Sequence, residues 1–243
     1  MPALLIALLG WLVAALLGVR YAGGTRAGGF DTALTHGLRD VVGNPTPLGK
    51  WAVTPPTTAT RILGTFSSPV VTYAVIVAVV LFAAWRRRWE VLGLAVLAPG
   101  VCVLLTELFK PLVDRRHSGY LSYPSGHTVS SVAALTVAVL AITWGAPAWR
   151  TVLAWIAWLL VVVCVLAGLV AMNYHYPTDT LGGLGLALGV TLPGAVLADG
   201  LSVRRAGLSL RRAARSAGPG TGRPDGTPRA GTSSDIPRPA SPR

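Results

Sequence analysis

The sequence predicts an all-α, polytopic membrane protein with six transmembrane helices. Of its 243 residues, 52% are hydrophobic and only 12% are charged, and the mean hydropathy is +0.58. A soluble domain has about 25% charged residues. Several apolar segments approach 20 residues, the length at which a helix crosses about 30 Å of hydrocarbon. The composition therefore excludes a soluble globular domain, a disordered chain, a coiled coil and a disulfide scaffold.

We expect the membrane-spanning helices at residues 3–19, 67–85, 91–109, 128–146, 151–172 and 180–199. These runs lack the alternation of polar and apolar residues that a transmembrane β-barrel requires. The first run has no basic start and no small-residue cleavage site after it, so we interpret it as a helix rather than a signal peptide. Residues 20–66 are rich in Gly, Pro and Thr, and predict a loop with an interfacial helix at 31–42.

The distribution of arginines predicts the orientation in the membrane. Arginines 86–88 separate the second and third runs, Arg150 separates the fourth and fifth, and more arginines follow the sixth. The positive-inside rule places these positions and both termini in the cytoplasm. The remaining connections, which then face outward, are 20–66, 110–127 and 173–179.

The chain divides into a transmembrane domain at 1–200 and a basic cytoplasmic tail at 201–243. The tail contains nine arginines and two aspartates, so +7 of the formal net charge of +12 lies in it. Gly, Pro, Ser and Thr dominate its later part, and such a composition predicts disorder. Beside a membrane, this charge favours the anionic inner leaflet as its partner rather than a nucleic acid.

Polar residues gather in two of the expected outer connections and predict one site built by converging loops. In the last of them, His175 precedes Asp179 by about one helical turn, and Pro177 fits the first turn of a helix. This spacing allows the Asp179 carboxylate to hold one imidazole nitrogen of His175 while the other nitrogen attacks a substrate. A loop histidine beside an unrelated aspartate remains the alternative.

The connection before the fourth span contains groups suited to a phosphate. Ser125 and Gly126 lead into the helix start, where free backbone N–H groups favour anions, and His127 can supply a proton. A turn capped by serine is the alternative. Lys110, Arg115 and Arg116 precede this segment and are suitable cations for a phosphate, unless they extend to lipid headgroups.

Together these residues resemble the type 2 phosphatidic acid phosphatase (PAP2) superfamily, in its membrane lipid phosphatase branch. The similarity covers about residues 60–200 and rests on Lys110, the sequence Pro-Ser-Gly-His at 124–127, and His175 with Asp179. It implies hydrolysis of a lipid phosphate or pyrophosphate through a phosphohistidine, without a metal or other cofactor. The implied catalytic residues are His175, His127 and Asp179, and the implied phosphate ligands are Lys110, Arg115, Arg116, Ser125 and Gly126.

Two departures from the family motifs concern arginines. The family has Arg-Pro where this chain has His117-Ser118, and Ser-Arg where it has Gly168-Leu169. A degenerate, non-catalytic relative that binds or moves lipid phosphates is therefore the alternative function. Vanadium haloperoxidases share the site, but six membrane spans argue against that chemistry.

Overall fold

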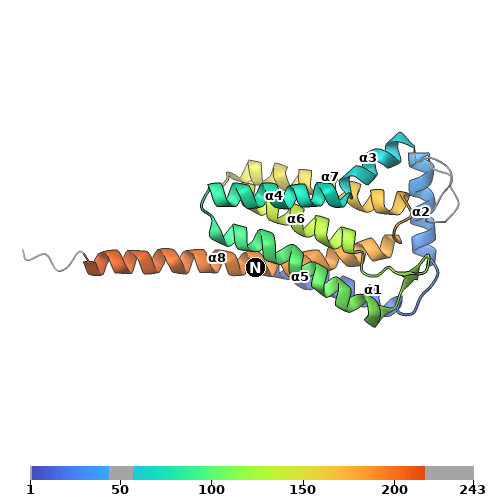
Figure 1. The fold of residues 1–243 in the computed structure, drawn as a ribbon, viewed down its shortest axis with the longest axis horizontal. Helices are drawn as coiled ribbons and strands as arrows, with labels where there is room; N and C mark the ends of the chain where they lie inside the picture. The colour runs from blue at the N-terminus through green and yellow to red at the C-terminus, as the bar shows by residue number, and fades with distance from the viewer. Residues whose placement is uncertain (1, 44–56, 217–243) are drawn as a thin grey trace, which may run out of the picture. The chain divides into compact units, whose positions relative to one another are not determined.

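The computed structural model is a helical bundle (Figure 1). It describes residues 2–43 and 57–216, in two units, Met1–Arg204 and Arg205–Arg243, which are considered separately here. The long helices are α1 (Pro2–Arg20), α4 (Pro69–Trp85), α5 (Trp89–Val113), α6 (Gly126–Thr143), α7 (Ala148–Ala171) and α8 (Pro177–Ser216). Within the described ranges, six helical segments are long and apolar enough to cross a membrane, and they confirm the six predicted spans.

Two shorter helices lie before α4. Helix α2 (Gly29–Val42) contains the predicted interfacial helix, and Asp31, Thr35 and Arg39 are buried along one of its faces. Helix α3 (Thr58–Phe66) was not expected, because we had assigned its residues to a loop. The Thr57 side chain caps α3 by accepting a hydrogen bond from the Thr60 amide at 3.2 Å. Residues 44–56, which belong to the same predicted loop, lie outside the described part.

A β-hairpin connects α5 to α6. Its strands are β1 (Arg116–His117) and β2 (Tyr120–Leu121), which pair antiparallel. The two turn residues, Ser118 and Gly119, both have positive φ angles, as a tight two-residue hairpin turn requires. Figure 1 shows this hairpin at the same end of the first unit as α2 and α3.

Small residues allow α1 and α8 to pack closely. A Cβ atom on Gly185 would lie 2.4 Å from the Gly10 carbonyl oxygen, so neither helix tolerates a side chain at this crossing. The Trp11 indole N–H donates to the Gly189 carbonyl at 3.0 Å, one turn further along. Close backbone approach at glycines is a common basis of helix association in membranes. The contact with α1 holds α8 in place, and the first turn of α8 contains Asp179 of the predicted site.

Helix α8 continues to Ser216, beyond the expected end of the last span. The first part of the predicted tail, residues 201–216, is therefore helical. Leu, Ala and Arg predominate between Val203 and Arg215, and these residues favour helix even where they are not apolar enough for a membrane. The rest of the predicted tail, 217–243, lies outside the described residues.

Candidate active site

A cavity of about 1250 Å³ lies among α3, α4, α5 and the start of α6. The hairpin and residues 172–175 also contribute to its wall. Of the predicted site residues, the cavity is lined by Lys110, Gly126, His127 and His175. Three separate segments of the sequence therefore meet at this cavity.

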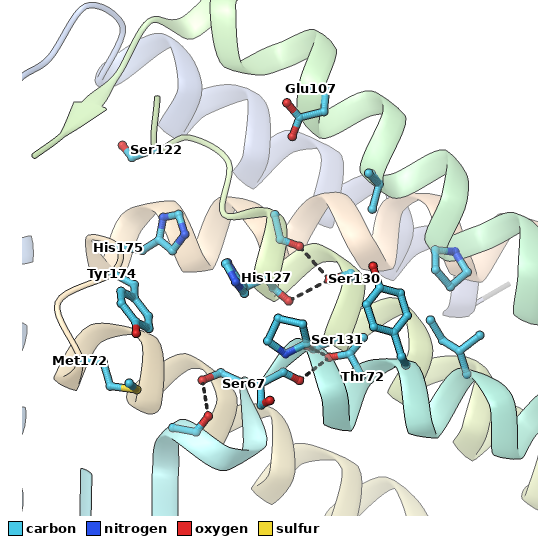
Figure 2. A pocket seen from close by; sticks show the side chains of 18 of the residues that line it. Ser67, Thr72, Glu107, Ser122, His127, Ser130, Ser131, Met172, Tyr174 and His175 are labelled. Carbon is cyan, nitrogen blue, oxygen red and sulfur yellow. Dashed lines mark hydrogen bonds between the residues drawn. The ribbon is translucent and has the colours of Figure 1, made fainter. Parts of the chain in front are cut away.

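His127 and His175 lie next to each other on this wall (Figure 2). Their ring centroids are 6.0 Å apart, and the Tyr174 ring stacks beside His127 with centroids 6.4 Å apart. The His127 ring is exposed to the cavity, whereas the His175 side chain is only 12% exposed. One phosphorus atom between the two rings would therefore be within reach of both imidazoles.

Asp179 lies behind His175, on the first turn of α8. Its Oδ2 atom is 3.9 Å from Nδ1 of His175, within ion-pair distance but longer than a hydrogen bond. The same oxygen accepts the Tyr176 amide at 3.2 Å. Nδ1 of His175 is buried and has no hydrogen-bond partner. The arrangement leaves Nε2 as the nitrogen available for attack on a substrate.

Lys110 is the predicted cation that lines the cavity. Its Nζ atom donates to Oε1 of Glu107 at 2.6 Å, and its side chain is 22% exposed. An ammonium has three donors, and Glu107 occupies one of them. Lys110 can therefore bind a phosphate oxygen while it keeps its carboxylate partner.

The loop before α6 is fixed by its own hydrogen bonds. Ser125 is fully buried, and its hydroxyl oxygen accepts both the amide and the hydroxyl of Thr128. The structure therefore assigns the Ser125 side chain to the helix cap, and the role of phosphate ligand that we predicted for it does not fit. Gly126 lines the cavity, and a Cβ there would meet only Thr106 at an ordinary 3.6 Å.

Tyr123 anchors the same loop to the bundle. Its hydroxyl donates to the Ala14 carbonyl of α1, and a Cβ on Gly182 of α8 would overlap its ring. Burial raises the pKa of the Tyr123 hydroxyl, which therefore stays a neutral hydrogen-bond donor. The Ser125 amide also donates to the Asp179 carbonyl at 3.1 Å. These contacts hold the segments that contain His127 and His175 at fixed positions relative to each other.

The two arginines predicted to bind phosphate lie elsewhere. Arg115 is 0% exposed and forms ion pairs with Asp31 and Asp179, both at 2.6 Å. Arg116 is half exposed and pairs with Asp114 at 2.9 Å. Neither arginine lines the cavity. Their assignment as phosphate ligands is thus replaced by three ion pairs, since both guanidinium groups already have carboxylate partners.

Arg61 of α3 also lines the cavity, and sequence reasoning missed it. Its segment lacks a familiar motif and falls in a stretch that we assigned to a loop. Helix α3 reaches this position because two glycines allow it to pack against the end of α7. A Cβ on Gly168 would lie 2.4 Å from the Leu63 carbonyl oxygen, and one on Gly64 would lie 2.4 Å from the Met172 sulfur.

Leu169 and His117 stand where the family motifs have arginines, and both make other contacts in this structure. Leu169 is fully buried in the bundle. His117 lines the cavity, with Nε2 2.9 Å from the Asn173 carbonyl and its ring packed edge-on against Tyr176. In the segments that the structure describes, His, Cys, Asp and Glu side chains form no group of three suited to a metal ion.

Both a family model and a solved structure are similar to this chain. Residues 105–198 match the family model of the PAP2 superfamily. The fold is similar to the crystal structure of a transmembrane PAP2 type phosphatidylglycerolphosphate phosphatase from Bacillus subtilis, with a TM-score of 0.59 and 19% sequence identity. That match covers 82% of this chain and 96% of the other. Among curated proteins, no sequence matches this chain.

The matched region begins five residues before Lys110 and includes both histidine motifs and about the first half of α8. The predicted resemblance to the PAP2 superfamily is therefore confirmed over residues 105–198, which lie within a bundle of six helices long and apolar enough to cross a membrane.

Proposed function

We propose that this protein hydrolyses a lipid phosphate or lipid pyrophosphate through a phosphohistidine, at the outer face of the membrane. The observation that supports this most directly is the placement of His127 and His175 on one cavity wall, with Asp179 behind His175. An attacking imidazole, a second imidazole and a carboxylate are the groups that two-step phosphoryl transfer needs.

In the first step, Nε2 of His175 attacks phosphorus and the bond to the leaving oxygen breaks. His127, in its protonated form, gives its proton to that oxygen. The phosphorylated imidazole ring carries positive charge, and the Asp179 carboxylate near Nδ1 stabilises it. In the second step, neutral His127 takes a proton from water, the resulting hydroxide attacks phosphorus, and inorganic phosphate leaves His175.

The cations for the non-bridging phosphate oxygens are Lys110 and Arg61. Among the described residues, they are the Lys and Arg side chains that line the cavity with the two histidines. They come from α5 and α3, so they approach the substrate from two different helices. Arg61 supplies the cation that is missing at Leu169, and the close contact of Leu63 with Gly168 holds α3 in place for this role.

The rest of the cavity suits an apolar chain. Between α4 and α5 its wall includes Tyr73, Ile76, Val96, Pro99 and Val103. Tyr73 and Val96 are more than half exposed, and on a membrane-spanning helix such side chains face lipid. A phosphate at the histidines would therefore have its acyl or prenyl chain between these helices. Phosphatidic acid, phosphatidylglycerol phosphate and polyprenyl phosphates or pyrophosphates all fit this description.

The arginine distribution supports a site on the outer side of the membrane. Arginines 86–88 join α4 to α5 at the opposite ends of these helices from the cavity. Under the positive-inside rule, the arginine-rich connections are cytoplasmic and the hairpin faces outward.

The proposal is tested by assaying the purified protein, in detergent and in the presence of EDTA, on a panel of lipid phosphates and pyrophosphates. We expect phosphate release, and 32P-labelled substrate should label the protein in an acid-labile, base-stable bond. His175→Ala should abolish both signals, and Asp179→Asn should lower kcat by about 10²- to 10⁴-fold. A tenth of wild-type activity remaining in His175→Ala would disprove the nucleophile. Substrate binding without turnover would instead favour the degenerate, non-catalytic relative suggested by Leu169.

A further inference from the structure

A buried cluster of charged side chains connects α2 to the aspartate behind His175. Its members are Asp31 of α2, Arg115 after α5, and Thr178 and Asp179 at the start of α8. The three charged side chains are 0% exposed, and Thr178 is 2% exposed. None of the four lines the cavity, so none can contact a substrate there.

Hydrogen bonds use nearly every polar atom of this cluster. Arg115 donates from Nη1 to Oδ1 of Asp179 and to the Thr178 hydroxyl, and from Nη2 to Oδ2 of Asp31, each at 2.6 Å. Oδ1 of Asp31 accepts the Thr178 amide at 2.9 Å and its hydroxyl at 2.7 Å. Oδ2 of Asp31 also accepts the Gly28 amide at 3.3 Å. Asp31 therefore binds both the arginine and the helix turn that contains Asp179.

Two aromatic rings enclose the guanidinium group. The Cζ atom of Arg115 lies 4.2 Å from the centroid of Tyr21 and 4.6 Å from that of Tyr176. These two cation–π contacts and the hydrogen bonds to Asp31, Thr178 and Asp179 fix the position of Arg115. Since Arg115 holds Oδ1 of Asp179, the other oxygen of that carboxylate is directed toward His175.

The cluster also has an excess of negative charge. Two carboxylates share one guanidinium, which leaves a formal charge of −1 in a site without exposed surface. Because the Arg115 charge is divided between Asp31 and Asp179, Asp179 is not fully neutralised. A carboxylate that remains negative beside His175 favours the positively charged ring of a phosphorylated histidine.

We infer that Asp31 and Arg115 are positioning residues for the phosphatase reaction, which act through Asp179. Helix α2, outside the matched PAP2 region, would thus contribute to catalysis in this chain. This inference rests on the proposed function. Groups that hold a catalytic side chain in position commonly affect the rate of the reaction without contacting the substrate.

The test compares kcat and KM on a short-chain, detergent-soluble phosphate ester. Asp31→Asn keeps the size of the side chain but removes the charge that shares Arg115, so Arg115 would neutralise Asp179. Arg115→Lys keeps the charge, but a single ammonium cannot bind Asp31, Thr178 and Asp179 together. We expect each variant to lower kcat at least tenfold and to change KM less than threefold. Asp31→Glu should retain more activity than Asp31→Asn.

Two comparisons distinguish a loss of positioning at Asp179 from a general effect on folding. Thr35→Val alters another buried position one turn along α2 and should keep kcat within twofold of wild type. Asp31→Asn should cost no further activity when it is added to Asp179→Asn, because its effect acts through that carboxylate. A structural effect would instead lower kcat by the same factor in both backgrounds. Thermal unfolding in detergent identifies the variants that remain folded at the assay temperature.

A kcat within twofold of wild type in folded Asp31→Asn or Arg115→Lys would overturn the inference, as would equal losses in the two backgrounds. If Asp31→Asn does not fold, Arg115→Lys and its combination with Asp179→Asn provide the same comparison. Failure of the proposed function gives a different result, because His175→Ala would then retain activity.

Discussion

The carbonyl oxygen of Leu63 in α3 lies so close to Gly168 in α7 that a Cβ atom at residue 168 would be 2.4 Å from it. Gly168 occupies the place where the resembling family has the serine of its Ser-Arg motif. The same contact that excludes a larger residue brings α3, and with it Arg61, to the cavity. Gly168 therefore both departs from the family motif and permits the α3 contact that brings Arg61 to the cavity wall.

Gly168→Ala should displace α3 and reduce both stability and activity. The added methyl group would meet backbone atoms, which cannot move as a flexible side chain can. We expect a lower midpoint of thermal unfolding in detergent and a kcat/KM reduced at least fivefold. Gly93→Ala is the matched control, because a Cβ on Gly93 of α5 meets nothing within 4 Å. Equal effects of the two variants would contradict the role of the α3 contact.

Arg61→Ala should lower kcat/KM tenfold or more, which corresponds to about 1.4 kcal/mol. A charge-assisted hydrogen bond to phosphate contributes about 1.5–3 kcal/mol, and Arg61→Lys should retain part of it. Arg116→Ala is the control, since Arg116 is half exposed, pairs with Asp114 and does not line the cavity. Steady-state kinetics on a short-chain substrate measure these effects without contacts to bilayer headgroups. Normal kinetics in Arg61→Ala would remove this residue from the phosphate site.

Gly100→Trp should discriminate between long-chain and short-chain substrates. Gly100 lines the part of the cavity between α4 and α5, and a Cβ there meets nothing within 4 Å, so the indole can fill this space. Turnover of a long-chain lipid phosphate should fall at least tenfold, while a short-chain ester is hydrolysed at nearly the normal rate. Gly93→Trp places the same side chain on α5 away from the cavity. Equal rates on both substrates would show that the chain binds elsewhere.

Cysteine labelling tests which side of the membrane contains the site. Arg116→Cys in the hairpin and Arg87→Cys between α4 and α5 are both exposed positions. An impermeant maleimide should label residue 116 in intact cells, and residue 87 only after permeabilisation. Cys102 and Cys164 are the native cysteines and should first be replaced by alanine. Labelling of residue 87 in intact cells would reverse the proposed orientation.

The sequence by itself determined the six membrane spans and singled out the two histidines, His127 and His175, that line the cavity. Both depend on local features. An apolar run of sufficient length forms a helix in a membrane because its backbone groups must bond within the segment. The one-turn spacing of His175 and Asp179 likewise depends on a single helix start, which Pro177 marks.

Only the tertiary structure decided which charged and hydroxyl groups line the cavity. Arg115 looked like a phosphate ligand in the sequence, but its partners Asp31 and Asp179 lie 84 and 64 residues away. Ser125 bonds within its own helix cap, and Arg61 enters the cavity only because α3 packs on Gly168. A charged side chain is stabilised by whichever opposite charge or cavity the fold brings near it, so its role depends on contacts that residue spacing does not encode.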